Sequence, residues 1–152
     1  MNEDLKILRS YMIRNPTIMK EIPEIRSEWG LYCKSFLNAV EMHTSKASKS
    51  YYYKYYVQYF NVIYKSFLEI DRTLLESGKC VIVVQDSYYK DIHNDLPKIF
   101  SEMAASLDWA TVDRLDYSIK QTMAGCNRAS MKYRSNSRAT ESVLVFKKGI
   151  KS

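Results

Sequence analysis

The sequence is poor in cysteine and histidine, and the few that it has are far apart. In 152 residues there are three cysteines and two histidines: Cys33, Cys80, Cys126, His43 and His93. An odd number of cysteines without a CxxC pair argues against a disulfide framework and against a zinc site. Neither histidine has a second ligand at metal-binding spacing, and neither is recognised near a plausible nucleophile, so we expect structural roles for both.

Glycine and proline are scarce as well, which excludes several kinds of active site. The glycines and prolines are Gly30, Gly78, Gly125, Gly149, Pro16, Pro23 and Pro97. No two glycines form a GxG pair, so the chain has no glycine-rich loop of the kind that lets a backbone approach a nucleotide cofactor closely. There is no Pro-Pro pair either, and the GxSxG, HExxH and P-loop motifs are absent.

Long apolar runs are missing too. No run approaches the roughly 18 residues that cross a bilayer, and the N-terminus lacks the basic-then-apolar layout of a signal peptide. A chain of 152 residues is long enough to bury one core. The sequence therefore predicts a cytoplasmic protein with no membrane contact.

What the sequence does contain is a helix–turn–strand stretch around which the rest can be arranged. Residues 81–84 (Val-Ile-Val-Val) are β-branched without polar alternation. This pattern predicts a strand buried on both faces, as in a parallel sheet covered by helices. Gly78 ends the preceding helix, and the polar residues Gln85, Asp86 and Ser87 follow the strand. We therefore expect an α/β fold built on this strand.

Apolar positions three and four residues apart predict four helices. They cover residues 2–15, 23–43, 51–74 and 95–107, with a kink or break expected at Gly30. The stripe of the third helix predicts which of its side chains belong to the core: Tyr56, Phe60, Ile63, Phe67, Ile70 and Leu74. The tyrosines off this stripe are expected to be exposed or to contact a part of the protein that is missing from this chain, and they are Tyr51, Tyr53 and Tyr55. Stacking of such tyrosines on unpaired bases is the alternative to a core role.

Two further strands are expected, at residues 111–119 and, antiparallel, at residues 142–147. The helix before the first of them would form a right-handed crossover from the valine-rich strand, so both strands would end at the carboxyl edge of the sheet. Ligands of open α/β sheets bind at this edge, which makes Gln85, Asp86 and Ser87 the candidate active-site residues. For Asp86 two roles stay open, a polar active-site residue and a cap of the following turn.

The charge distribution points to a polyanionic partner. The net charge is +6, and basic residues without any acid occupy residues 44–68 and 120–138. The second stretch connects the last two strands, although hairpin connections usually need only about 2–5 residues. We expect it to contact nucleic acid, with phosphates, bases or sugars bound by Lys120, Asn127, Arg128, Lys132, Tyr133, Arg134 and Arg138. A solvated, unstructured surface loop is the alternative.

Several of these segments resemble one family in their order and spacing. Residues 75–79 (Leu-Glu-Ser-Gly-Lys) are similar to the Leu-Lys-Pro-Gly-Gly turn before the fifth strand of class I S-adenosylmethionine-dependent DNA methyltransferases. Residues 85–87 resemble the Gly-Asp-Ser tip of that strand, residues 95–100 the helix after it, and residues 141–147 the closing strand. The resemblance covers about residues 50–149.

The resemblance implies a partial Rossmann-like methyltransferase sheet of about three strands over residues 50–152, preceded by an N-terminal helical segment, residues 1–49. It implies methyl transfer to the exocyclic amine of adenine or cytosine in DNA, with S-adenosylmethionine as the cofactor of the complete enzyme. The family's cofactor loop is absent, and so is its tetrapeptide of aspartate, asparagine or serine followed by Pro-Pro and an aromatic residue. No catalytic or cofactor-binding residue is therefore assigned, and the chain alone is expected neither to bind the cofactor nor to transfer methyl groups.

Three functions stay open. The chain is the C-terminal part of a site-specific DNA methyltransferase that needs a companion chain or an upstream segment, or a non-catalytic nucleic-acid-binding module, or a structural partner that dimerises through the unfilled side of its sheet. Salt-dependent binding to DNA or RNA is expected of the second. Self-association is expected of the third, because an exposed edge strand and an apolar face favour it.

Overall fold

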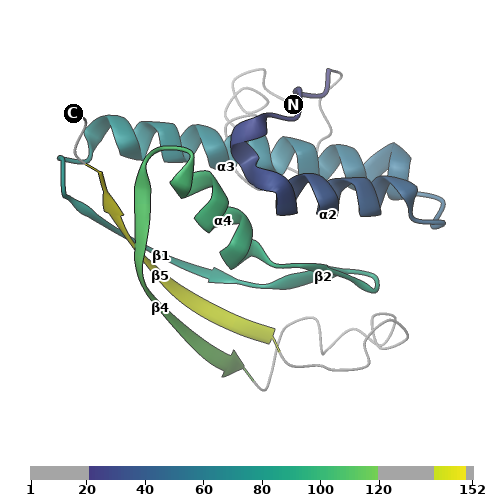
Figure 1. The fold of residues 1–152 in the computed structure, drawn as a ribbon. Coiled ribbons are helices and arrows are strands. Elements are labelled where there is room, and N and C mark those ends of the chain that lie inside the picture. The colour runs from purple at the N-terminus through teal and green to yellow at the C-terminus, as the bar shows by residue number, and fades with distance from the viewer. Residues whose placement is uncertain (1–20, 120–138, 150–152) are drawn as a thin grey trace, which may run out of the picture.

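The computed structural model describes residues 21–119 and 139–149. In this part of the chain, three α-helices lie on one side of a three-stranded antiparallel sheet, as Figure 1 shows. The helices are α2 (Gly30–Met42), α3 (Tyr53–Thr73) and α4 (Leu96–Ala105). The strands of the sheet are β1 (Lys79–Gln85), β4 (Trp109–Ile119) and β5 (Ala139–Lys148), and a separate two-stranded sheet consists of β2 (Ser87–Tyr89) and β3 (Ile92–Asn94). The fold is thus a mixed α/β arrangement, as expected, and none of the described helices is long and apolar enough to span a bilayer.

Gly30 is the first residue of helix α2 and directly follows a short 3₁₀ turn, Ser27–Trp29. Its φ of 86° is one that glycine adopts without strain, and an added Cβ would overlap the side chain of Glu102 from α4. The Glu102 carboxylate accepts a hydrogen bond from the backbone N–H of Tyr32 at 2.9 Å, so it satisfies one of the amides that the first turn of α2 leaves free. The predicted break at Gly30 is confirmed, and it gives a carboxylate of α4 room to bind the start of α2.

Helix α3 turns its apolar stripe into the core, as the periodicity predicts. Phe60, Ile63 and Phe67 are buried, and the remaining members of the stripe are partly buried against the same cluster: Tyr56, Ile70 and Leu74. Of the tyrosines off the stripe, Tyr51 is exposed, whereas Tyr53 and Tyr55 are half-buried.

One cluster of buried side chains joins all the described layers. It contains Trp29 and Leu37 from the N-terminal side of residue 50 together with Phe67 of α3 and Phe146 of β5. The division of the chain at residue 50 stays a prediction.

The turn between α3 and β1 contains Gly78, as predicted. Gly78 does not end the helix, however. Helix α3 ends at Thr73, before the turn, and the residue with a positive φ, 60°, is Ser77. Gly78 donates its N–H to the backbone oxygen of Leu75 at 2.9 Å. An added Cβ at Gly78 would lie 2.6 Å from that oxygen, so the position needs glycine for space rather than for its dihedral angles.

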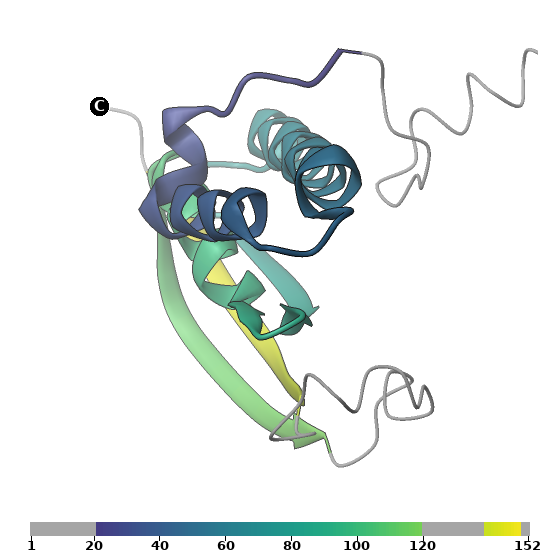
Figure 2. The same ribbon diagram turned by 90° about the vertical axis from the view of Figure 1, so that its right-hand side faces the viewer.

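Strand β1 has one buried face only, so the prediction of a strand buried on both faces in a parallel sheet is wrong. Within the described residues it pairs only with β5, antiparallel, in an unbroken register over all seven of its residues. Val84 is 7% exposed, whereas Val81 and Val83 are each 59% exposed. The outward positions are also valine, so the sequence shows no alternation although the burial alternates along the strand. The second face of the sheet carries no described helix, as Figure 2 shows.

Helix α4 begins as predicted, with Asp95 as its N-cap. The Asp95 carboxylate accepts a hydrogen bond from the backbone N–H of Lys98 at 3.0 Å. Pro97 lies in the first turn, where its missing N–H costs no hydrogen bond. The apolar stripe of α4 packs into the core, with Leu96, Ile99, Phe100 and Met103 buried and Leu107 partly buried.

Strand β5, the last in sequence, lies between β1 and β4 and runs antiparallel to both. β1 and β4 therefore point in the same direction and end at the same end of the sheet, where Gln85 and Tyr117 flank Glu141 in one row. The predictions of an antiparallel last strand and of a shared end for the two preceding strands are confirmed. β4 forms the second edge of the sheet, and its register shifts between Thr111 and Asp113, which marks a β-bulge.

A buried ion pair joins the end of α3 to β4 and β5. The ammonium of Lys148 lies 3.0 Å from Oδ1 of Asp71, and its side chain is 9% exposed. Lys148 also donates to the backbone oxygens of Asp71 and Leu74. The indole N–H of Trp109 donates to the same Asp71 carboxylate at 2.8 Å. A lysine at the end of a strand is therefore part of the core rather than of the surface.

The hairpin of β2 and β3 is absent from the predicted elements. Tyr89 pairs with Ile92, so the connecting turn consists of Lys90 and Asp91. Hairpin turns of two residues usually contain glycine or asparagine because they need a positive φ. Lys90 has a φ of 58° without being either residue, which explains why the sequence shows no turn signal there.

Replacing Lys90 with glycine is expected to raise the free energy of unfolding by up to about 1 kcal/mol, because glycine adopts a positive φ without the clash of a Cβ atom. Urea unfolding of the full chain measures the change. Lys90→Ala is the matched control: it removes the same side chain but keeps Cβ, so it should bring no gain. Equal effects of the two substitutions would contradict a strained residue at this position.

Candidate site at the carboxyl end of the sheet

Asp86 follows β1 directly and connects it to β5 and to the β2–β3 hairpin. Its carboxylate accepts a hydrogen bond from the backbone N–H of Thr140 at 2.8 Å and lies 3.0 Å from Nε2 of His93. Its own N–H donates to the backbone oxygen of Thr140 at 3.0 Å. The Asp86 side chain is 10% exposed. These contacts reach across strands, so the cap of the following turn is not the role observed, and an active-site role stays a prediction.

The two neighbours of Asp86 point elsewhere. Gln85 is exposed and lies opposite Glu141, so it belongs to the uncovered face of the sheet. Ser87 opens β2, and its hydroxyl accepts a hydrogen bond from Nδ2 of Asn94 at 3.0 Å. The three consecutive candidates therefore do not converge on a single point.

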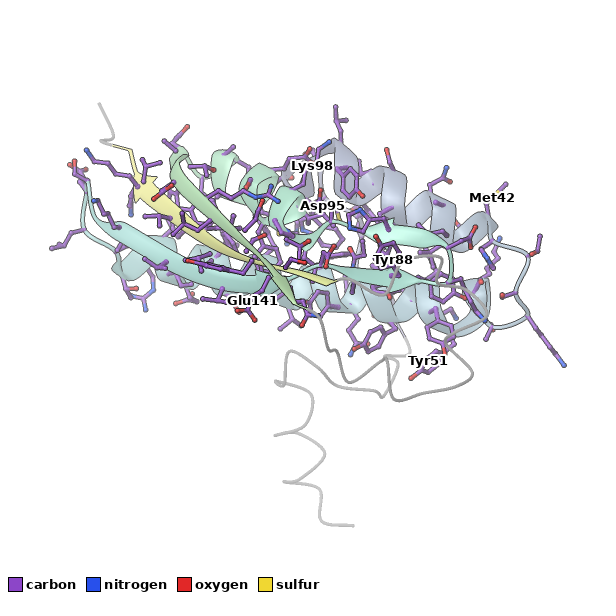
Figure 3. The ribbon with its side chains drawn as sticks, turned by 90° about the horizontal axis from the view of Figure 1, so that it is seen from below. Met42, Tyr51, Tyr88, Asp95, Lys98 and Glu141 are labelled. Carbon is purple, nitrogen blue, oxygen red and sulfur yellow. The ribbon has the colours of Figure 1, made fainter. Side chains whose placement is uncertain are left out.

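His93 of β3 is a member of this site that the sequence does not reveal. Its ring centroid lies 4.8 Å from that of Tyr88, and its backbone oxygen accepts a hydrogen bond from the hydroxyl of Tyr32 at 3.2 Å. The ammonium of Lys98 lies 4.8 Å from the centroid of the Tyr32 ring. Figure 3 labels Tyr88 and Lys98 near Asp95, towards the middle of the view. The register of an unpredicted hairpin brings these groups together, so no spacing in the sequence would have indicated them.

An arginine–aspartate pair on β4 lies near the same end. Nε of Arg114 donates to both carboxylate oxygens of Asp116, at 2.9 and 3.1 Å, and the hydroxyl of Ser142 donates to one of them at 2.5 Å. These hydrogen bonds, that from Arg114 first, hold the pKa of Asp116 below its usual value. The same contact raises the pKa of Arg114. The Asp116 side chain is 45% exposed, so a water-accessible, fully charged pair stands beside the ends of β1 and β4.

The second histidine lies close to a serine hydroxyl, which corrects the expectation that no nucleophile is near a histidine. Nε2 of His43 lies 3.1 Å from Oδ1 of Asp91, and its Nδ1 lies 3.4 Å from Oγ of Ser48. The arrangement has the order of a catalytic triad. Ser48 is completely buried, however, and its hydroxyl lies 2.5 Å from that of Tyr89. A substrate cannot reach this oxygen, so the cluster stabilises the loop before α3 instead.

The predicted nucleic-acid contacts lie outside the described residues. These are Lys120, Asn127, Arg128, Lys132, Tyr133, Arg134 and Arg138. The strands on either side of them are described: β4 ends at Ile119 and β5 begins at Ala139, in register with each other. The residue after Ala139 is Thr140, whose backbone binds Asp86. Both ends of the basic segment therefore meet the sheet beside the candidate residues.

Metal ligation and thiol chemistry receive no support from the described residues. Among them, no group of three or more histidine, cysteine, aspartate or glutamate side chains is placed to hold a metal ion. Burial raises the pKa of the Cys33 thiol to about 12 and raises that of Cys80 as well, so neither supplies a thiolate near neutral pH.

Comparison with known proteins gives no relative: neither a family model, nor a curated protein, nor a solved structure matches the chain.

Proposed function

We propose that the chain is the C-terminal part of an S-adenosylmethionine-dependent, site-specific DNA methyltransferase of the adenine- or cytosine-amino type, with a partial Rossmann-like sheet. The order of its elements supports this proposal. A turn containing glycine, strand β1, helix α4, strand β4 and an antiparallel last strand occur in the order that the sequence resemblance implies, with the unpredicted β2–β3 hairpin inserted between β1 and α4. A companion chain or an upstream segment would supply the cofactor loop and the catalytic tetrapeptide, and this chain would complete the sheet and bind DNA.

The observation that carries the proposal is the position of β5 between β1 and β4. Neighbouring strands lie about 4.8 Å apart, so the ends of β1 and β4 are roughly 10 Å from each other, and β5 starts between them. The segment 120–138 leaves β4 and enters β5 at this point, beside Asp86. A segment with five basic residues and no acid is thus attached at the end of the sheet where open α/β sheets bind their ligands.

The candidate residues of the segment and of the adjoining end of β1 have proposed roles that follow from their chemistry. The cations would neutralise DNA phosphates, and they are Lys120, Arg128, Lys132, Arg134 and Arg138. Asn127 and Tyr133 would contact bases or sugars. Asp86 would keep the start of β5 in place through Thr140, and Gln85 and Ser87 would lie beside the bound DNA without acting on it.

A non-catalytic nucleic-acid-binding module is the second candidate, and the missing cofactor loop favours it. Both candidates require the chain to bind nucleic acid through the basic segment. They differ in whether a complementary polypeptide restores methyl transfer.

Binding of duplex DNA by the full chain is expected to weaken steeply as salt is raised, with a slope of log K against log[salt] of about −0.9 for each phosphate contact. Arg134→Ala should reduce the magnitude of this slope by about one, because it removes one such contact. Fluorescence anisotropy with a labelled duplex over a salt series measures both slopes. The matched control is Arg72→Ala, since Arg72 lies on α3 and pairs with Glu69 at 2.9 Å. Binding that ignores salt, or equal slopes for all three proteins, would contradict the proposal.

The catalytic part of the proposal has its own test. The chain alone is expected to give no heat of binding with S-adenosylmethionine and no transfer of a labelled methyl group to DNA. Addition of a polypeptide that carries a Pro-Pro-aromatic motif and is encoded directly upstream should restore transfer. Cofactor binding or turnover by the isolated chain would refute the half-domain proposal. Normal DNA binding without restored transfer would favour the non-catalytic module.

A further inference from the structure

The two edges of the sheet differ in how they are protected against further strand pairing. Free edges of natural sheets usually carry bulges, charged residues or proline, which keep other strands away. β4 has such protection, since it contains the bulge after Thr111 and the charged residues Asp113, Arg114 and Asp116. β1 has an unbroken register, no proline, and a single charged residue, Lys79, at its beginning. The edge of β1 is thus built for pairing and the edge of β4 is not.

The backbone groups available on β1 follow from its pairing with β5. Asp86 donates its N–H to Thr140, and Gly78 accepts from Lys148, so the even-numbered residues of β1 bond to β5. The odd-numbered residues therefore direct their N–H and C=O groups to the other edge, and they are Lys79, Val81, Val83 and Gln85. Their side chains lie on the uncovered face, which Figure 3 shows from below. Val81 and Val83 are each 59% exposed.

We propose that the free edge of β1 pairs with the same edge of a second copy of the chain, antiparallel and centred on Ile82, to give a continuous six-stranded sheet. In this register Val81 lies opposite Val83 of the second copy, and Lys79 lies opposite Gln85. All paired residues are odd-numbered on both sides, so each such pair can exchange two backbone hydrogen bonds. No like charges face each other, and the four central side chains are valines, which are favourable cross-strand partners.

The inference goes beyond the proposed function and does not depend on it, because oligomeric state and DNA binding are measured separately. A two-fold contact at an edge is self-complementary, and it is the commonest symmetry of soluble oligomers. If the edge instead takes a strand from a different polypeptide, such as the companion of the proposed function, the isolated chain would remain a monomer.

Sedimentation equilibrium of the full chain over a concentration series tests the proposal. A monomer–dimer equilibrium is expected, and Val81→Lys combined with Val83→Lys should raise the dimer dissociation constant about ten- to hundredfold, because each new lysine faces another across the axis. Leu115→Lys is the matched control: Leu115 is exposed on the same face but belongs to β4, so the dimer should persist.

A second measurement locates the contact without altering the sequence. In hydrogen exchange at rising protein concentration, the amides of Val81 and Val83 should become protected in parallel with dimer formation. A monomer at every concentration would overturn the proposal. A dimer that leaves these amides exchanging freely, or that the Leu115 variant disrupts and the double valine variant does not, would overturn it as well.

Discussion

Replacing Asp71 with alanine is expected to lower the free energy of unfolding by about 3–5 kcal/mol, because the substitution leaves a buried ammonium without its carboxylate. That ammonium belongs to Lys148, whose Nζ lies 3.0 Å from Asp71 and whose side chain is 9% exposed. The indole N–H of Trp109 loses its acceptor at the same time. Urea unfolding followed by circular dichroism measures the loss.

Two controls separate burial from charge in this experiment. Glu69 lies two residues before Asp71 and pairs with Arg72 where both side chains are 70% exposed, so Glu69→Ala should change stability by less than about 1 kcal/mol. Joint replacement by Asp71→Leu and Lys148→Met should recover most of the loss, since an apolar pair can replace a buried ion pair at little cost. An Asp71→Ala effect as small as that of Glu69→Ala would contradict the buried ion pair.

Asp86→Ala is expected to lower the free energy of unfolding by about 2–3 kcal/mol. Most of this effect comes from the N–H of Thr140, which loses the carboxylate that it donates to at 2.8 Å. The contact with His93 adds less, because the His93 side chain is 40% exposed. The amide of Thr140 should also exchange its hydrogen faster, which nuclear magnetic resonance of the labelled chain detects.

The sign of the Asp86 effect decides between a structural and a purely functional residue. Residues held in place for activity often cost stability, so their replacement leaves it unchanged or raises it. Asp86→Asn is the matched control, since an amide oxygen can still accept from Thr140, and it should retain more stability than alanine. His93→Ala should cost about 1 kcal/mol or less. A gain in stability with Asp86→Ala would remove the structural role.

Helices α2, α3 and α4 could be predicted from the sequence because their patterns are local, although α2 begins only at Gly30 rather than at residue 23. The predicted helix at residues 2–15 lies outside the described residues. The stripe of α3 repeats every three or four residues and faces one core, so the buried Phe60 and Phe67 follow from periodicity alone. The N-cap at Asp95 and the proline two residues later mark the start of α4 in the same way. The antiparallel direction of β5, which the sequence also predicts, is confirmed.

The surroundings of β1 could not be predicted, for a different reason. Alternation shows which face of a strand is buried only when the other face is polar, and here valine occupies both faces. The edge position of β1 depends on its partners, and those are residues of β5 about sixty positions later in the chain. The same limit hides the ion pair of Lys148, which follows another lysine and looks in the sequence like a surface residue.

The sequence predicts where the candidate site lies, but it does not predict which residues contact one another there. The end of β1 and the end of β4 do meet at one end of the sheet, as the crossover argument predicts. The partners of Asp86 are Thr140, which lies 54 positions away, and His93, which the glycine-free hairpin brings back to it. Contacts of this kind depend on register, and register is fixed by the tertiary fold.

The central place of β5 has a consequence for how the protein is made. During translation β1, α4 and β4 leave the ribosome first, but β1 and β4 are joined in the sheet only through β5. Within the described sheet, neither strand has its partner until residues 139–148 have been synthesised and can pair with both. Premature termination before that point would release a nascent chain with unpaired valine-rich strand surface, the kind of intermediate that chaperones bind and that otherwise aggregates.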